Sequence, residues 1–342
     1  MKYIKINNRF ISELHKPLVV AEIGINHFGS LRVAKHLVVK AKKSGAEAVK
    51  VQIHIPDEEM SEESKKIKPG NSNLSIYKVI KNNSLSLKKE ILLRKFIKKN
   101  KLIYIATPFS FKAVDFLKKN PPDIVKIGSG ECNNIPLINY VCLLKKPVIL
   151  STGMNSIYSI KNSTKVLEKN KIKYILLYCI NLYPAPLDLI RLNAIKQYKK
   201  CFKKSITIGY SDHTEGIEIA TIALSLGAKV IEKHFVISKN DDGPDVSSSM
   251  NPEELKKLIL ISNNMSGLIR MPKKNNKEEK ITKNFAFHSV VAKKNIYPGD
   301  ILSFDNLTTK RPGNGCYKAN DIYKLLGKKS KSFVKKNYQV KK

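Results

Sequence analysis

The sequence predicts a (β/α)8 barrel followed by a small second domain. Its 342 residues suit a barrel of about 250 residues with an appendage. From Leu18 onward, eight short β-branched runs recur, and most of them precede a longer segment of helical period. The composition then changes to a charged stretch without apolar period, followed by short strands and turns. These three observations predict parallel strands closed by helices, and a separate C-terminal unit.

The eight candidate strands are nearly continuous apolar runs, which is typical of parallel strands buried on both faces. Eight such strand and helix units close a barrel. The strands are predicted to begin near Leu18, Ala48, Leu102, Asp123, Pro147, Tyr174, Ile206 and Lys229.

Helices are predicted between these strands wherever apolar residues recur with helical period. The predicted helices cover residues 31–44, 87–99, 111–119, 157–170, 217–226 and 252–261. The insertion between the second and third strands, residues 57–86, is polar and contains Gly and Pro. It predicts an extended loop over one mouth of the barrel, which makes it a candidate lid.

The change of composition sets the domain boundaries. We place the barrel at residues 1–268, a linker at 269–283 and the second domain at 284–342. A domain of about 60 residues buries little core by itself. We therefore expect it to pack against something else.

The formal net charge of +35 is of the kind that indicates a nucleic-acid or membrane-surface partner. Here, however, the lysines are scattered along the polar sides of apolar-periodic segments. No arginine-rich arm and no basic block interleaved with aromatic residues is present. This pattern is typical of solvated helix faces. We expect no nucleic-acid partner and no membrane partner, and a site that favours anionic substrates.

Two further features of the composition bear on the cellular compartment. No segment approaches the roughly 20 uninterrupted apolar residues of a membrane span, and the N-terminal residues lack the apolar run of a signal peptide. The five cysteines are widely spaced and form no C-x-x-C pair, so neither a disulfide framework nor a zinc ribbon is indicated. We expect a cytoplasmic protein with reduced thiols.

Catalytic groups of such barrels lie at the C-terminal ends of the strands, so the polar residues that close each strand are the candidates. Two lysines lie within apolar strands, where a surface role is difficult. With nearby hydroxyl and amide side chains they predict a cationic cup for a phosphate and a carboxylate. The predicted cup comprises Lys50, Thr107, Lys126, Ser129, Ser151, Asn181 and Ser211.

Two histidines close the last two predicted strands. Either His213 or His234 alone is more simply explained as a structural side chain. Two of them at equivalent strand ends, beside acidic residues, instead favour a pair of imidazole ligands for a divalent metal. We interpret Asp212 as a supporting group or cap rather than a ligand.

At these positions the chain resembles the N-acetylneuraminate (sialic acid) synthases and their relatives that make legionaminic and pseudaminic acids. The resemblance spans nearly the whole chain and implies a TIM barrel followed by a C-terminal antifreeze-like (SAF, β-clip) domain. It is carried by AEIGINHFGS, AVKVQ, ATPFS, KIGSGECNNIPLI, PVILSTGMNS, NLYPAP, IGYSDHTEG, EKHF, GPDVSSSMNPEEL, FAFHSVVAKKNIYPGD and KRPGNG.

The resemblance implies condensation of phosphoenolpyruvate with N-acetylmannosamine and water, giving N-acetylneuraminate and phosphate by carbon–oxygen cleavage. It implies Mn²⁺, or Mg²⁺ or Co²⁺, on His213 and His234, and phosphoenolpyruvate in the cup. Glu131 is the candidate for orienting or deprotonating water, and Glu22 is a further catalytic candidate. The residues implied to meet the sugar are Glu22, Gln52, Asn71, Tyr183, Asp245 and Arg311.

The family arrangement also implies a domain-swapped homodimer, in which Arg311 of the small domain reaches the partner's barrel. One position departs from the family pattern, because Tyr178 precedes Cys179 where relatives usually have a histidine. The small residues of GPDVSSS favour the N-acetylneuraminate branch.

Other functions stay open at this point. One is a synthase of legionaminic acid, pseudaminic acid or a spore-coat sugar, and another is a metal-dependent aldolase. A third is a basic nucleic-acid-binding protein, although a protein devoted to binding would not need polar groups at every strand end.

Overall fold

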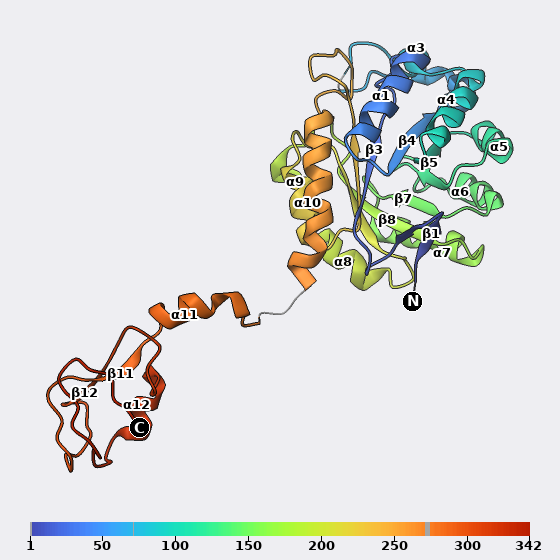
Figure 1. Cartoon of the computed structure of the whole chain (residues 1–342). Helices are drawn as coiled ribbons and strands as arrows, with labels where there is room; N and C mark the ends of the chain where they lie inside the picture. The colour runs from blue at the N-terminus through green and yellow to red at the C-terminus, as the bar shows by residue number, and fades with distance from the viewer. Residues whose placement is uncertain (1, 71, 271–273) are drawn as a thin grey trace. The chain divides into compact units, whose positions relative to one another are not determined.

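The computed structural model describes residues 2–70, 72–270 and 274–342. The chain forms two compact units, Met1–Arg270 and Met271–Lys342. In the first, eight parallel strands close into a barrel in the order β10-β3-β4-β5-β6-β7-β8-β9, with helices around it (Figure 1). The predicted barrel is confirmed. Its strands are β3 (Leu18–Glu22), β4 (Ala48–Ile53), β5 (Ile103–Pro108), β6 (Ile124–Ile127), β7 (Val148–Ser151), β8 (Tyr174–Cys179), β9 (Ile208–Asp212) and β10 (Val230–His234).

Four of the long surrounding helices begin at a serine whose side chain accepts a hydrogen bond from the backbone N–H three residues later. Each of the four also carries lysines in its last turn, where a positive charge is stabilised by the helix dipole. These helices are α1 (Leu31–Lys43), α4 (Leu87–Lys99), α5 (Phe111–Lys119) and α7 (Ile157–Lys169). Capping thus explains why the predicted and observed bounds agree so closely.

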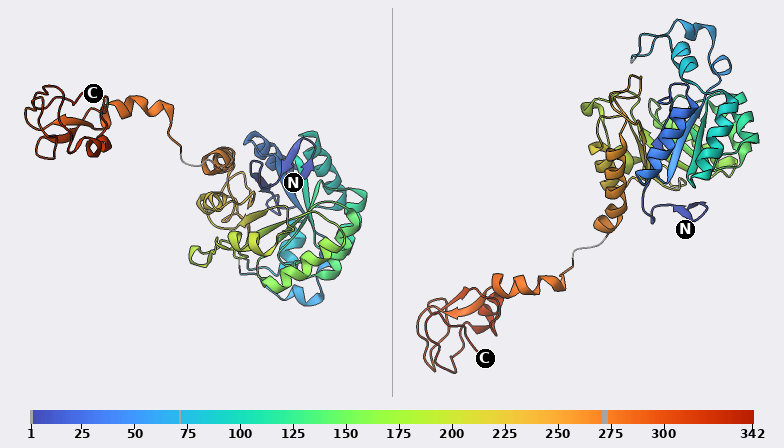
Figure 2. Two further views of the ribbon diagram at one scale, coloured as in Figure 1. Left: turned by 90° about the horizontal axis from the view of Figure 1, so that it is seen from below. Right: turned by 45° about the horizontal axis from the view of Figure 1, so that its top comes forward.

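The remaining barrel helices follow the same ring (Figure 2). The sequence pattern predicted α9 (Glu218–Ser225) and the first half of α10 (Pro252–Arg270), but α10 continues beyond the expected end at residue 261. It did not predict α6 (Ile135–Val141), which is too short to show a clear period, or α8 (Ala194–Cys201). No helix among the described residues is long and apolar enough to cross a membrane.

A short hairpin closes the N-terminal end of the barrel. Its strands, β1 (Ile4–Ile6) and β2 (Arg9–Ile11), pair antiparallel. Ile4, Ile6 and Ile11 are buried in one apolar cluster with residues inside the barrel, such as Leu18 and Ile175. The sequence analysis did not predict this hairpin. It leaves the opposite end of the barrel for the chemistry.

The insertion between β4 and β5 is not the extended loop that its polar composition predicted. It contains α2 (Pro56–Glu59), the 3₁₀ turn η1 (Glu62–Lys65) and α3 (Ile76–Asn83). Tyr77 and Ile80 bury one side of α3, and the Tyr77 hydroxyl donates to Asp57 at 2.6 Å. Figure 1 shows α3 and the hairpin strand β1 at opposite ends of the barrel.

The second unit has a small core of its own around Val290, Ile296, Leu307 and Val334. Strands β11 (Ser289–Ala292) and β12 (Leu307–Lys310) pair antiparallel, and the short helix α12 (Ile322–Leu325) contributes to the core. The segment expected as a linker, 269–283, contains the end of α10, the turn η4 (Lys277–Glu279) and the first residues of α11 (Lys280–Ala286).

Candidate active site

The candidate residues of the first unit gather at the C-terminal mouth of the barrel. Successive side chains of a strand alternate between its two faces, so Lys50 and Gln52 of β4 share one face, as do Glu232 and His234 of β10. Both lysines, Lys50 and Lys126, are buried. The barrel thus brings two cations into an interior that contains no bulk water, which is costly unless they are paired.

Two carboxylates balance these cations. Glu232 Oε1 lies 2.5 Å from Lys126 Nζ and 3.6 Å from Lys50 Nζ, and it accepts a hydrogen bond from the Ser211 hydroxyl at 3.2 Å. Lys50 Nζ also lies 2.8 Å from Glu22 Oε2. Glu232 is not among the site residues predicted from the sequence. The structure places it at the centre of the charge cluster.

The pKa values of the four charged groups in this cluster are shifted in different directions. Burial disfavours the charge on Glu232, but Lys126 and Lys50 outweigh it and lower its pKa to about 2. Burial likewise opposes the charge on Lys50, yet Glu22 and Glu232 raise its pKa. For Lys126 burial prevails and lowers the pKa despite Glu232, and for Glu22 burial raises the pKa to about 7. An anion that binds the lysines therefore competes with carboxylates already present.

A cavity of about 220 Å³ is lined by Lys50, Lys126 and Glu232 of this cluster. All seven residues of the predicted cup line it, together with Glu131, His213 and Glu232. Two glycines make room for it, because a Cβ at Gly153 would lie 2.0 Å from Asn181 Oδ1 and one at Gly128 would lie 2.4 Å from Glu131 Oε2. The glycines of the STGM and IGSG segments thus supply space for functional side chains.

Several buried polar atoms at this mouth have no hydrogen-bond partner among the described residues. They are Ser151 Oγ, Glu131 Oε2, Glu232 Oε2 and His234 Nδ1. Such an atom costs about 1 to 3 kcal/mol when it stays unpaired, so a group of them at one place indicates a ligand site. Burial raises the pKa of Glu131 to about 7, so this carboxyl can exchange a proton near neutral pH.

A second cavity of about 560 Å³ adjoins the first. Asp245 lines it, and burial raises the pKa of this carboxyl to about 6. The two cavities share Gln52, Phe109, Asn181, Tyr183 and His234. The mouth is therefore one site with a small charged part and a larger, mixed part.

The two histidines stand at this junction, with ring centroids 5.6 Å apart. His213 Nδ1 donates to the Ile180 carbonyl at 2.7 Å, which leaves Nε2 with a free lone pair. Burial lowers the pKa of His213 to about 4 and that of His234 well below its ordinary value, so both rings are neutral. His234 Nδ1 has no hydrogen bond and lies 3.4 Å from Asp245 Oδ2.

This donor set fits a divalent cation with two protein ligands. Neutral imidazoles are the form that binds a metal. In the part of the chain that the structure describes, no group of three or more His, Cys, Asp or Glu side chains is arranged to hold a metal. Any cation on His213 and His234 would thus complete its coordination with water or substrate oxygen. Tyr183 stacks on His213 with centroids 4.1 Å apart and restricts the access of solvent to the pair.

Three residues stand outside this arrangement. Asn71 lies outside the described residues. Arg311 belongs to the second unit, where it is exposed and donates from Nε to the Ala286 carbonyl at 3.1 Å. Tyr178 faces the helix layer, since its ring meets that of Tyr198 on α8 edge to face, with centroids 6.3 Å apart. The departure from the family pattern at Tyr178 is thus a change in the packing behind β8.

Asp212 also points away from the barrel interior. Its carboxylate accepts hydrogen bonds from Lys233 Nζ at 3.0 Å and from the Thr214 hydroxyl at 2.8 Å. Both Asp212 and Lys233 are fully buried. This ion pair anchors the chain on either side of His213, in agreement with the supporting role assigned to Asp212.

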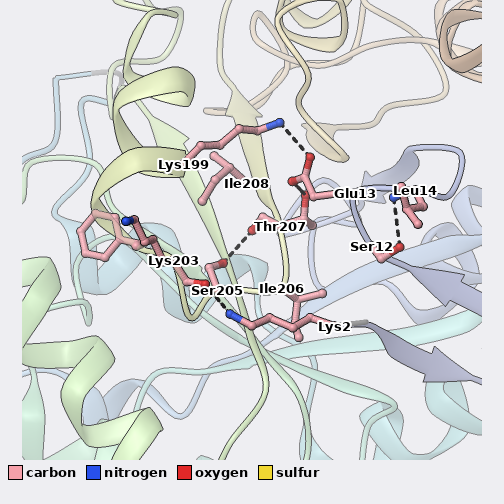
Figure 3. Close-up of a pocket in the computed structure, with 11 residues that line it drawn as sticks. Lys2, Ser12, Glu13, Leu14, Lys199, Lys203, Ser205, Ile206, Thr207 and Ile208 are labelled. Carbon is pink, nitrogen blue, oxygen red and sulfur yellow. Dashed lines mark hydrogen bonds and ion pairs between the residues drawn. The ribbon is translucent and has the colours of Figure 1, made fainter. Parts of the chain in front are cut away.

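Another cavity, of about 450 Å³, lies at the N-terminal end of the barrel (Figure 3). Lys199 Nζ pairs there with Glu13 at 2.9 Å, and Glu13 also accepts a hydrogen bond from Thr207. These contacts tie the segment after β2 to the start of β9. The predicted catalytic side chains do not line this cavity, and its contacts are explained by closure of the barrel.

The barrel mouth holds a buried anion cup and a pair of neutral histidines, and a small β unit follows the barrel in the chain. Comparison with known proteins identifies the class of protein that combines these features. Residues 37–272 match the NeuB family and residues 287–341 match the SAF domain. The chain belongs to the NeuB family, the sialic and nonulosonic acid synthases. The predicted family and the predicted SAF domain are both confirmed.

Individual relatives cover almost the whole chain. N,N'-diacetyllegionaminic acid synthase of Campylobacter jejuni is 40% identical over 95% of this chain and 98% of its own length. Human N-acetylneuraminate-9-phosphate synthase is 31% identical over 94% of this chain and 90% of its own. A crystal structure of N-acetylneuraminic acid (sialic acid) synthetase from Leptospira borgpetersenii, in complex with citrate, superimposes with a TM-score of 0.74 at 29% identity, covering 82% of this chain and 95% of that one.

Proposed function

We propose that this protein condenses phosphoenolpyruvate with N-acetylmannosamine and water to give N-acetylneuraminate and phosphate. The observation that carries the proposal is the two-part cavity. A cup of about 220 Å³ contains two buried lysines and adjoins a space of about 560 Å³, and His234 lines both. The cup suits a small, highly charged molecule, and the larger space suits a neutral sugar.

The cup residues would bind phosphoenolpyruvate in two ways. Lys50 and Lys126 offer charge-assisted hydrogen bonds to phosphate and carboxylate oxygens. Ser151, whose hydroxyl is buried without a partner, and Ser129 offer neutral donors. Binding of the anion would draw the lysines away from Glu22 and Glu232 and so favour protonation of Glu22, whose pKa burial already raises to about 7.

The larger cavity would hold the open-chain sugar, with its aldehyde carbon facing the methylene carbon of phosphoenolpyruvate. Gln52, Tyr183 and Asp245 line this space and would bind hydroxyl and amide groups of the sugar. A divalent cation, Mn²⁺ or alternatively Mg²⁺ or Co²⁺, held by His213 and His234 would supply Lewis acidity at the carbonyl oxygen.

The remaining proton transfers would fall to the carboxyl groups. The new carbon–carbon bond leaves an alkoxide at the former aldehyde carbon and a cationic centre at the phosphate-bearing carbon. A neutral carboxyl group at the mouth would protonate the alkoxide, and water adds at the cationic centre. Glu131, whose pKa burial raises to about 7, can take the proton from that water. Cleavage of the carbon–oxygen bond then releases phosphate.

A second substrate is favoured by the 40% identity to the Campylobacter jejuni N,N'-diacetyllegionaminic acid synthase. Its sugar substrate would be a doubly N-acetylated hexosamine. We test both substrates by measuring phosphate release from phosphoenolpyruvate with N-acetylmannosamine, its 6-phosphate and the diacetylated sugar, each with and without added Mn²⁺. Turnover of N-acetylmannosamine in preference to the other two sugars supports the proposal. Preference for the diacetylated sugar would instead make that sugar the substrate. No phosphate release with any of them rejects both.

We further propose a homodimer in which the second unit of one chain completes the site of the other. Arg311 is exposed in its own unit, and the small core around Val290 and Leu307 leaves large apolar side chains such as Phe304 and Phe333 exposed. The guanidinium fork of Arg311 is suited to the acyl carbonyl of the sugar. We propose a cytoplasmic location, because the proposed reaction consumes phosphoenolpyruvate, which is made there.

A further inference from the structure

A chain of hydrogen bonds leads from the charge cluster to helix α2. The Gln52 carboxamide stands in its middle: Nε2 donates to Glu22 Oε1 at 3.0 Å, and Oε1 lies 2.9 Å from His54 Nε2. The other ring nitrogen, His54 Nδ1, faces both carboxylate oxygens of Glu59, at 2.9 and 3.2 Å. The sequence analysis assigned no role to His54 or Glu59, although both follow β4 within a few residues.

This arrangement is buried and rigid. Only 5% of the His54 side chain and 4% of the Glu59 side chain are exposed. The His54 ring stacks on Phe109, with centroids 4.3 Å apart and an interplanar angle of 9°. His54 and Phe109 both line the 560 Å³ cavity. The pair of Glu59 and His54 therefore forms the support behind one wall of the site.

The partners determine the hydrogens on the imidazole. When Glu22 is ionised beside Lys50 it can only accept, so the amide nitrogen of Gln52 faces it and the carbonyl oxygen of Gln52 faces His54. That carbonyl and the Glu59 carboxylate are both acceptors. The carbonyl oxygen of Gln52 therefore accepts a hydrogen bond from His54 Nε2–H, and His54 Nδ1 faces the Glu59 carboxyl group.

We propose that Glu59 and His54 are positioning residues that lock the carboxamide of Gln52, so that its amide nitrogen faces Glu22 and its second N–H is presented to the sugar. The inference rests on the proposed function, in which Gln52 binds the sugar. A free glutamine side chain must give up rotamer entropy when it binds, and the lock removes that cost in advance. His54 lines the sugar cavity, and neither His54 nor Glu59 lines the phosphate cup, so the lock acts mainly on the sugar side of Gln52.

Four variants test the lock. His54→Phe keeps an aromatic ring but removes both ring nitrogens, and His54→Gln restores a donor toward Gln52. Glu59→Gln keeps the shape of the Glu59 side chain and removes its charge. This variant keeps the proposal testable if His54→Phe, which leaves Glu59 buried without its partner, does not fold. The matched control is Glu58→Gln in the same helix, because the Glu58 side chain is 42% exposed and pairs only with Lys112 among the described residues.

We expect His54→Phe to raise the KM for the sugar about tenfold, the equivalent of one lost hydrogen bond, and the KM for phosphoenolpyruvate less than about twofold. His54→Gln should recover part of the loss, Glu59→Gln should fall between, and Glu58→Gln should match the wild type. An equal rise in both KM values, or no difference between His54→Phe and His54→Gln, would overturn the proposal.

Failure of the proposed function is distinguishable, since it appears as absence of phosphate release by the wild type. A second measurement does not depend on the reaction. In ¹⁵N NMR of the substrate-free protein, the His54 ring, assigned by its loss in His54→Phe, should carry a hydrogen on Nε2, which faces the Gln52 carbonyl, in the wild type and in Glu58→Gln. A wild-type ring with no hydrogen on Nε2 would reject the lock whatever the substrate is.

Discussion

Glu90 provides a test of the structure that does not depend on the proposed reaction. It lies on the buried side of α4, where it is 2% exposed, and its Oε2 has no hydrogen-bond partner among the described residues. Burial raises the pKa of Glu90 from an ordinary value of 4.5 to about 8. The hydroxyl of Tyr104, also buried without a partner, is close enough to interact with it.

The sign of the effect follows from proton linkage. Because the pKa is higher in the folded chain, the folded state holds the Glu90 proton in a range of pH where the unfolded chain has released it. The contribution to stability is thus complete below about pH 4.5 and is lost as the pH rises toward 8. At pH 7 the loss amounts to at most about 3 kcal/mol, from 2.5 pH units at about 1.4 kcal/mol each.

Glu90→Gln replaces the carboxyl by a neutral group of the same shape. We expect the variant to be up to about 3 kcal/mol more stable than the wild type at pH 7, and equally stable at pH 4, where both side chains are neutral. Urea unfolding of the full chain, followed by circular dichroism at pH 4, 5.5, 7 and 8, measures the difference. A difference that is the same at every pH would show that charge on Glu90 is not its cause.

Three predictions concern the proposed site. His234→Ala should lose turnover and affinity for Mn²⁺ yet unfold near the wild-type temperature by calorimetry, since its Nδ1 has no hydrogen bond to lose; full activity in metal-free buffer would contradict the ligand assignment. Lys126→Met should raise the KM for phosphoenolpyruvate roughly 10- to 100-fold, equivalent to about 1.5 to 3 kcal/mol for a charge-assisted contact, and that for the sugar much less; equal changes would make the lysine structural. Inactive Arg311→Ala and His234→Ala proteins should regain activity when their subunits exchange, and no recovery despite exchange seen by mass spectrometry would place Arg311 outside the partner's site.

The barrel could be predicted because its local signals are strong. Most barrel strands are largely apolar over four to six residues, and serine caps mark the start of several long helices. Where an element is short, its sequence pattern did not predict it. The three-residue strands of the N-terminal hairpin and the seven residues of α6 are too short to show a period. In the insertion, the mostly polar composition predicted a loop. It outweighed the short apolar pattern of Tyr77, Val79 and Ile80, which form the buried side of α3.

By itself the sequence determined which side chains reach the mouth of the barrel, because the strand pattern fixes where each strand ends and which residues alternate inward. Only the tertiary structure decided how these side chains pair. Lys126 on β6 and Glu232 on β10 are 106 residues apart, on strands that are not neighbours in the barrel, yet their charged atoms meet at 2.5 Å. Such a contact across the interior depends on closure of the whole barrel, which no local pattern encodes. The same holds for His54, whose partners on α2 and β4 are brought together by the fold of the insertion.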